Sequence, residues 1–135
     1  MMTNTLRVDK IELFDPLEGK ITFTTQNGKQ IEAFFWGEKF EEQKDYLVEF
    51  TSLDYPLDWN VIFSENKEKI KSLILEKGLC SYLAYGQIVS INPTVVDFGD
   101  IIMEIHLPTN DEKVIGEYIY WRIDRLDILE TKSSA

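Results

Sequence analysis

The sequence contains one cysteine, Cys80, and one histidine, His106. A single thiol cannot form an internal disulfide, so we expect the fold to depend on its apolar core and to suit a reducing, cytoplasmic compartment. One cysteine and one histidine do not supply a zinc-ligand set of the usual number and spacing. We therefore expect no metal and no cofactor, and we interpret Cys80 as a buried, inert thiol.

Long apolar runs and targeting signals are also missing. No stretch approaches the roughly 20 consecutive apolar residues that a membrane-spanning helix needs, and residues 1–13 contain no apolar signal segment. We therefore expect no membrane partner. The 44% of hydrophobic and 13% of aromatic residues exclude an intrinsically disordered chain. The length of 135 residues predicts one globular domain over residues 1–135, with a frayed tail at residues 130–135.

Motifs of common catalytic sites are missing as well. The sequence has neither a glycine-rich phosphate loop nor a Gly-x-Ser-x-Gly nucleophile elbow. Asp97-Phe98-Gly99 matches the magnesium-binding letters of protein kinases, but the other kinase motifs do not accompany it, so we interpret it as a chance match. We expect no enzyme. A small hydrolase with paired carboxylates is the catalytic alternative, because 24 acidic residues allow many pairs.

Alternating apolar and polar residues are frequent and predict strands. Residues 5–14 form the first pattern, with Leu13 facing inward and a bulge near Lys10. Asn27-Gly28 joins the next two patterns, residues 19–25 and 29–36, in the turn most typical of a β-hairpin. The remaining patterns cover residues 45–53, 82–91, 95–107 and 115–129, the last of them with a register shift near Arg125.

One segment has the pattern of a helix. Ser64 is suited to the N-terminal cap and Gly78 to the C-terminal end. The apolar residues between them form one stripe at helical spacing, consisting of Ile70, Leu73 and Ile74. The sequence therefore predicts one α-helix, over residues 65–77, between two groups of strands.

This order of elements predicts a mainly β fold of the β-rich α+β class. We expect a small antiparallel barrel or a strongly curled sheet with the helix between its strand groups. The OB-fold is one candidate, because its helix lies between the third and fourth strands of a five-stranded barrel.

The last strand pattern, residues 115–126, has two different sides. The side that we expect to face the core consists of Ile115, Ile119, Trp121 and Ile123. The other side carries Tyr118, Tyr120 and Arg122. Tyrosine and arginine dominate interface hot spots, and aromatic rows on sheets can also stack nucleic-acid bases. We interpret this row as a set of partner anchors; cross-strand packing that only stabilises the sheet is the alternative interpretation.

The charge of the chain is strongly negative, with a formal net charge of −10. Residues 38–60 hold seven acidic residues and two lysines, interleaved with aromatic residues. Carboxylates on a surface steer basic partners and repel polyanions. The predicted steering residues are Glu41, Glu42, Asp45, Asp54 and Asp58. A solubilising surface charge is the alternative interpretation.

Together these features predict a non-catalytic protein-binding module with a basic partner, most simply an inhibitor that neutralises a toxin domain. In size and charge the chain resembles the bacterial immunity proteins, although no motif of that group can be matched residue by residue. An OB-like nucleic-acid-binding domain is the first alternative, and the negative charge disfavours it. An uncharacterised small hydrolase is the second. The sequence leaves the oligomeric state open.

Overall fold

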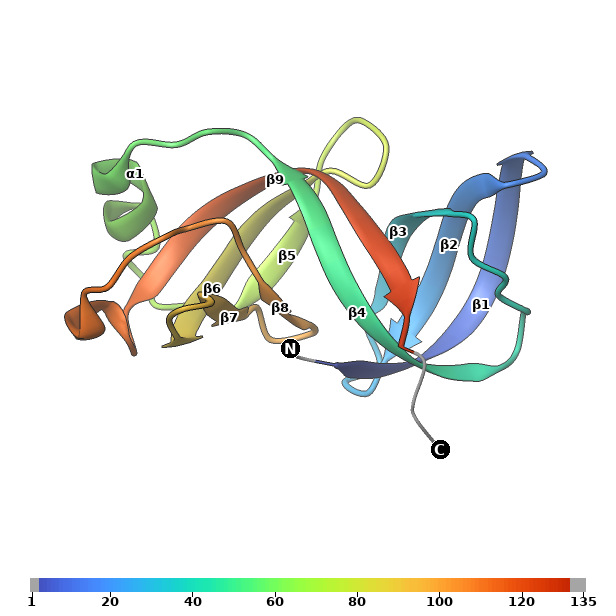
Figure 1. Ribbon diagram of the computed structural model, residues 1–135, viewed down its shortest axis with the longest axis horizontal. Coiled ribbons are helices and arrows are strands. Elements are labelled where there is room, and N and C mark those ends of the chain that lie inside the picture. Colours follow the sequence, from blue (N-terminus) through green and yellow to red (C-terminus); the bar gives the residue numbers. More distant parts are fainter. Residues whose placement is uncertain (1–2, 132–135) are drawn as a thin grey trace.

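The computed structural model describes residues 3–131, which fold almost entirely into β-strands (Figure 1). The elements in chain order are β1 (Asn4–Asp15), β2 (Glu18–Thr25), β3 (Gln30–Trp36), β4 (Asp45–Asp54), α1 (Trp59–Ser64), β5 (Ser72–Leu75), β6 (Tyr82–Ser90), β7 (Val95–Asp97), β8 (Ile102–Glu104), the 3-10 turn η1 (Glu112–Val114) and β9 (Tyr118–Glu130). Neither helix within this range is long and apolar enough to cross a bilayer.

Five of the strands form a ring. Its order is β1-β2-β3-β9-β4, and β4 returns to pair with β1. All neighbours in the ring are antiparallel except β3 and β9, which meet in parallel at Phe34 and Asp127. This arrangement confirms the mainly β, barrel-like fold that the sequence predicts. The OB-fold also has five strands, but here the connection from β3 to β4, residues 37–44, contains no helix.

The remaining strands extend the same sheet from β9. The first part of β9 pairs with β6, which also pairs with β5 and β7, and β8 follows as the outer neighbour of β7. Figure 1 shows β9 crossing the molecule from the side of β5–β8 to the side of β1–β3. The buried apolar residues of both sides form one contiguous cluster, from Val8 and Phe23 to Ile88 and Met103. Strand β9 is therefore an interior strand and not an exposed edge.

Several local predictions are confirmed. The β2–β3 hairpin turns at Gly28, whose φ of 84° requires a residue that tolerates the left-handed region. The bulge near Lys10 is present as a register shift between Val8 and Lys10. The shift predicted near Arg125 is also present, because β9 moves by one residue against Leu53 and Asp54 of β4.

The prediction of a helix over residues 65–77 is wrong. Ser64 ends α1 instead of capping a helix, and Leu73 lies in β5, buried opposite Ala84 of β6. Helical spacing and strand pairing compete for the same short apolar run, and the ladder with β6 prevails over local propensity. Asn66 fixes the irregular segment before β5, because its Nδ2 donates to the carbonyls of Ile70 and Ile119.

Three other sequence-based assignments also need correction. Leu13 and Ile115 were both expected to face the core, but they are 63% and 45% exposed because each lies beside a turn at the end of the sheet. The predicted frayed tail starts too early, since Glu130 pairs with Val48 and the amide of Thr131 donates to the carbonyl of Leu47. Residues 132–135 of that tail lie outside the described residues.

Gly86 of β6 packs tightly against residues 96–98, and a side chain at this position should lower stability. A Cβ at this position would lie 2.6 Å from the carbonyl oxygen of Asp97 and 2.7 Å from side-chain atoms of Val96 and Phe98. We expect Gly86→Ala to lower the free energy of unfolding by about 1–3 kcal/mol through overpacking. Chemical denaturation measures this change. The matched control is Val89→Thr on the exposed side of the same strand, which should change stability by less than about 0.5 kcal/mol. Equal stability of the two variants would contradict the prediction.

Candidate functional site

The outer face of β6 and β9 gathers aromatic side chains from separate parts of the chain. The register places Tyr85 opposite Tyr120, and Arg122 and Tyr118 opposite neighbours of Tyr85 on the same face. These residues alternate with buried ones, so their side chains point away from the core. Tyr55, which directly follows β4, adjoins them. We call this set the tyrosine patch; it consists of Tyr55, Tyr85, Tyr118, Tyr120 and Arg122.

The side chains of the tyrosine patch hold one another in place. The rings of Tyr85 and Tyr120 are 5.3 Å apart, and the guanidinium carbon of Arg122 lies 4.4 Å from the centre of the Tyr55 ring. Glu76 pairs with Arg122 at 3.6 Å. Tyr118 and Tyr120 are half-buried, whereas Tyr55 remains 42% exposed. The predicted row is therefore open to solvent but already ordered.

Carboxylates surround the tyrosine patch. A hydrogen bond with Asp124 raises the pKa of Tyr55, because the carboxylate accepts from the protonated phenol. Burial raises the pKa of Tyr120, and the negative charges of Glu76 and Glu65 add to this effect. Arg122 is thus the one cation among the five patch residues; Lys71, which is paired with Asp97, lies near Tyr118.

The predicted steering residues do not form one surface. Glu41, Glu42 and Asp45 lie at the start of β4, and each is engaged within the chain. The partners are Lys44 for Glu41, the amide of Ile11 for Glu42, and Arg7 for Asp45. Asp54 and Asp58 lie at the other end of β4, about 30 Å away at 3.3 Å per strand residue. Of the five predicted steering residues, only Asp54 and Asp58 are close in the chain to Tyr55 of the tyrosine patch.

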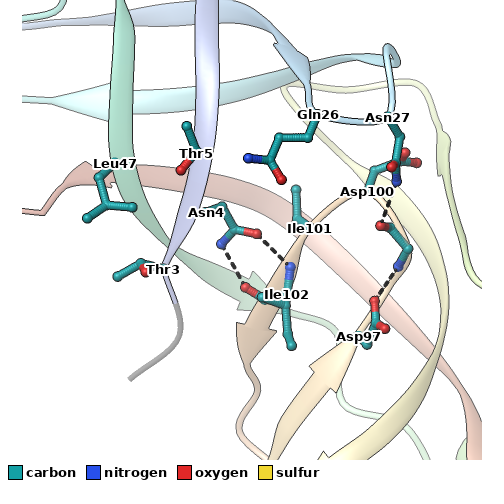
Figure 2. Close-up of a pocket in the computed structure, with 11 residues that line it drawn as sticks. Thr3, Asn4, Thr5, Gln26, Asn27, Leu47, Asp97, Asp100, Ile101 and Ile102 are labelled. Atoms are coloured by element: carbon teal, nitrogen blue, oxygen red, sulfur yellow. Dashed lines mark hydrogen bonds between the residues drawn. The ribbon is translucent and has the colours of Figure 1, made fainter.

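A polar cleft of about 340 Å³ lies where β1, the β2–β3 turn and the β7–β8 turn meet (Figure 2). Its two carboxylates already have partners, since Asp97 binds Lys71 at 3.0 Å and Asp100 pairs with Lys29 at 3.4 Å. Asn4 exchanges two hydrogen bonds of 2.8 Å with the backbone of Ile102, as Figure 2 shows. Among residues 3–131, no group of three or more potential metal ligands is present. We interpret this cleft as a seam that joins the two sides of the fold.

The groups with the largest pKa shifts have structural roles. Cys80 is buried as expected, and burial raises the pKa of its thiol to about 12. Burial also raises the pKa of Tyr82, whose hydroxyl donates to the carbonyl of Glu32 at 2.7 Å and accepts from its amide at 2.8 Å. Tyr82 lines a recess of about 270 Å³ beside β3 and β5, but the backbone of Glu32 engages its hydroxyl as both donor and acceptor, which favours a structural role. His106 is exposed.

Two features of the surface were not predicted. Tyr85 was not assigned to the binding face, although its alternation with Ala84 and Gly86 could have indicated it. Large apolar side chains are also exposed where the β1–β2 turn meets the end of β3. We call these the apolar end; it consists of Leu13, Phe14, Leu17 and Trp36.

Comparison of the chain with protein-family models, curated proteins and solved structures finds no match.

The pKa of Cys80 predicts a loss of stability at alkaline pH. The unfolded thiol ionises near its usual value of 9.0, whereas the folded thiol keeps its proton until about pH 12. Between these values the native state binds more protons, so its stability falls as the pH rises, by up to about 1.4 kcal/mol per pH unit. Denaturation of the wild type and Cys80→Ala across this range measures the effect. The decline should be shallower in Cys80→Ala, and parallel curves would contradict the assignment to this thiol.

Proposed function

We propose that the protein is a non-catalytic binding module for a basic protein, of the inhibitor type that neutralises a cationic partner, and that the tyrosine patch is its contact surface. The observation that carries this proposal is the ordered outer face of β6 and β9. There, tyrosines in ring contact and one arginine remain partly accessible on adjacent strands.

The composition and order of the patch suit protein recognition. Tyrosine and arginine contribute large contact areas and hydrogen-bonding ends, and they are enriched among residues whose truncation costs most binding energy. The contact between the tilted rings of Tyr85 and Tyr120, and that of Arg122 with the ring of Tyr55, restrict these side chains before a partner arrives. Less side-chain entropy is then lost on binding, which favours affinity.

Charge supports a basic partner. The chain has a net charge of −10, and the only cation of the patch, Arg122, is paired with Glu76. Single-stranded nucleic acids need a basic track beside the aromatic residues, and the rim here is acidic instead, with Asp124 and Glu65 beside the tyrosines. Glu41, Glu42 and Asp45 lie outside the contact surface. Their role in the proposal is limited to the long-range field.

Two triple variants test the proposal by comparison with the wild type. The patch variant combines Tyr118→Ser, Tyr120→Ser and Arg122→Ser; the control variant combines Leu13→Ser, Phe14→Ser and Leu17→Ser in the apolar end. Each immobilised protein, once shown to unfold cooperatively, is exposed to native lysate at low salt. We expect the wild type and the control variant to retain the same basic proteins, and the patch variant to retain at least about tenfold less, a loss of about 1.4 kcal/mol.

The variant that loses retention of basic proteins shows whether the tyrosine patch or the apolar end binds them. Retention that fails only in the control variant would assign binding to the apolar end and contradict the proposal. Retention should also weaken as salt is raised to about 0.5 M, because steering between exposed charges is screened. A polarisation titration with a single-stranded oligonucleotide at low salt should show no binding. Binding that the patch variant abolishes would support the nucleic-acid alternative instead.

A further inference from the structure

A second recess lies beside the tyrosine patch. It is a pocket of about 240 Å³ between the end of β4, the irregular segment 55–57, α1 and the chain that follows β8. Its apolar walls come from Leu57, Ile62 and Leu107, and Tyr55, Asp54 and His106 also line it. Drug-sized ligands occupy pockets of about 300–1,000 Å³. This pocket is smaller and suits one side chain or a group of similar size.

Two buried polar groups of this pocket have no partner. Asp54 is the last residue of β4, and its alternation with Phe50 and Ser52 turns its side chain toward the inner face. Both of its carboxylate oxygens are shielded from solvent and form no hydrogen bond within residues 3–131. Trp121 also lines the pocket; it is 4% exposed, and its indole Nε1 has no acceptor. In the β4–β9 register Asp54 is opposite Ile123, which places Trp121 diagonally beside it.

No cationic side chain of residues 3–131 pairs with Asp54, although His106 lines the same pocket. None of the ion pairs within residues 3–131 includes Asp54. Arg122 is close in the sequence of β9, but its side chain is on the outer face, on Tyr55 and Glu76. Carboxylate oxygens that are shielded from water and lack a partner are unfavourable. A bound cation would offset this cost, and none of residues 3–131 supplies one in contact with these oxygens.

We propose that this pocket binds the guanidinium or ammonium group of an arginine or lysine side chain of the basic partner. This inference rests on the proposed function and adds the chemistry that the partner must present. A carboxylate with two free oxygens matches the paired N–H groups of a guanidinium. Tyr55 and Trp121 line the pocket, and aromatic rings attract cations. The aliphatic walls suit the stem of a long basic side chain.

The position of the pocket agrees with this role. Tyr55 belongs to both surfaces, since its ring lines the pocket and carries the guanidinium of Arg122. A partner that covers the tyrosine patch can therefore insert a neighbouring side chain. Residues 55–57 form one wall and lie outside any helix or strand, so this wall can shift at lower cost than the strands behind it.

Small cations test the pocket directly. Butylguanidinium and butylammonium are titrated into the full chain while the indole N–H resonance of Trp121, assigned with Trp121→Phe, is followed by NMR. We expect a saturable shift with a millimolar dissociation constant, about −4 kcal/mol. The isosteric Asp54→Asn should weaken binding at least about tenfold, whereas Asp58→Asn, which removes an exposed charge nearby, should leave it unchanged. The stronger of the two probes shows whether arginine or lysine chemistry fits better.

Three outcomes would overturn the inference. They are no saturable shift, equal affinity for the neutral probe butanol, and equal affinity in Asp54→Asn; each would mean that the pocket holds water only. Failure of the proposed function is a separate result. Binding of butylguanidinium without retention of any basic protein would support the cation site and reject the partner-binding role. Retention of basic proteins that depends on the tyrosine patch, without binding of the probe, would support the partner-binding role and reject the cation site.

Discussion

The shared strand β9 is the constraint on which the rest of the structure depends. Its residues up to Ile123 pair with β6, and its residues from Ile123 onward pair with β4. Both parts must bury an apolar side, yet Trp121 and Leu126 would face opposite ways in an uninterrupted strand. The extra residue at Asp124 corrects the alternation, so that both are buried. One bulge therefore lets a single strand serve the ring and the extension of the sheet.

The same bulge explains why both candidate sites lie together. Because Ile119, Trp121 and Ile123 must face the core, the intervening tyrosines and Arg122 face solvent. Strand β4 ends opposite the shift, at Asp54, which remains on the inner side beside Trp121. The next residue, Tyr55, leaves the sheet and reaches the outer face, where it stacks on Arg122. The tyrosine patch and the pocket thus lie on the outer and inner sides of the end of β4.

Features that depend on neighbouring residues in the chain could be predicted from the sequence. Alternation and the Asn27-Gly28 turn predicted the hairpin, and the apolar residues that change sides after Asp124 predicted the register shift in β9. The prediction of a helix over 65–77 is wrong because Leu73 pairs with Ala84 of β6. A pairing with a residue 11 positions away cannot be deduced from the pattern of residues 65–77 alone. The prediction that the acidic residues of segment 38–60 share one surface is wrong for a similar reason. They are close in sequence, but β4 holds its two ends far apart.

Paired and unpaired carboxylates would act on a basic partner in two different ways. Glu41 and Asp45 are exposed and already paired, so they act on a partner only through a field that salt screens within about 10 Å. Such charges affect mainly the rate of association. The oxygens of Asp54 are shielded from water. In the proposed complex Asp54 would contribute once a cation reaches it, at short range and with little screening. An interaction of this kind acts mainly on the rate of dissociation, so the selectivity of the proposed complex depends more on one buried carboxylate than on the total charge.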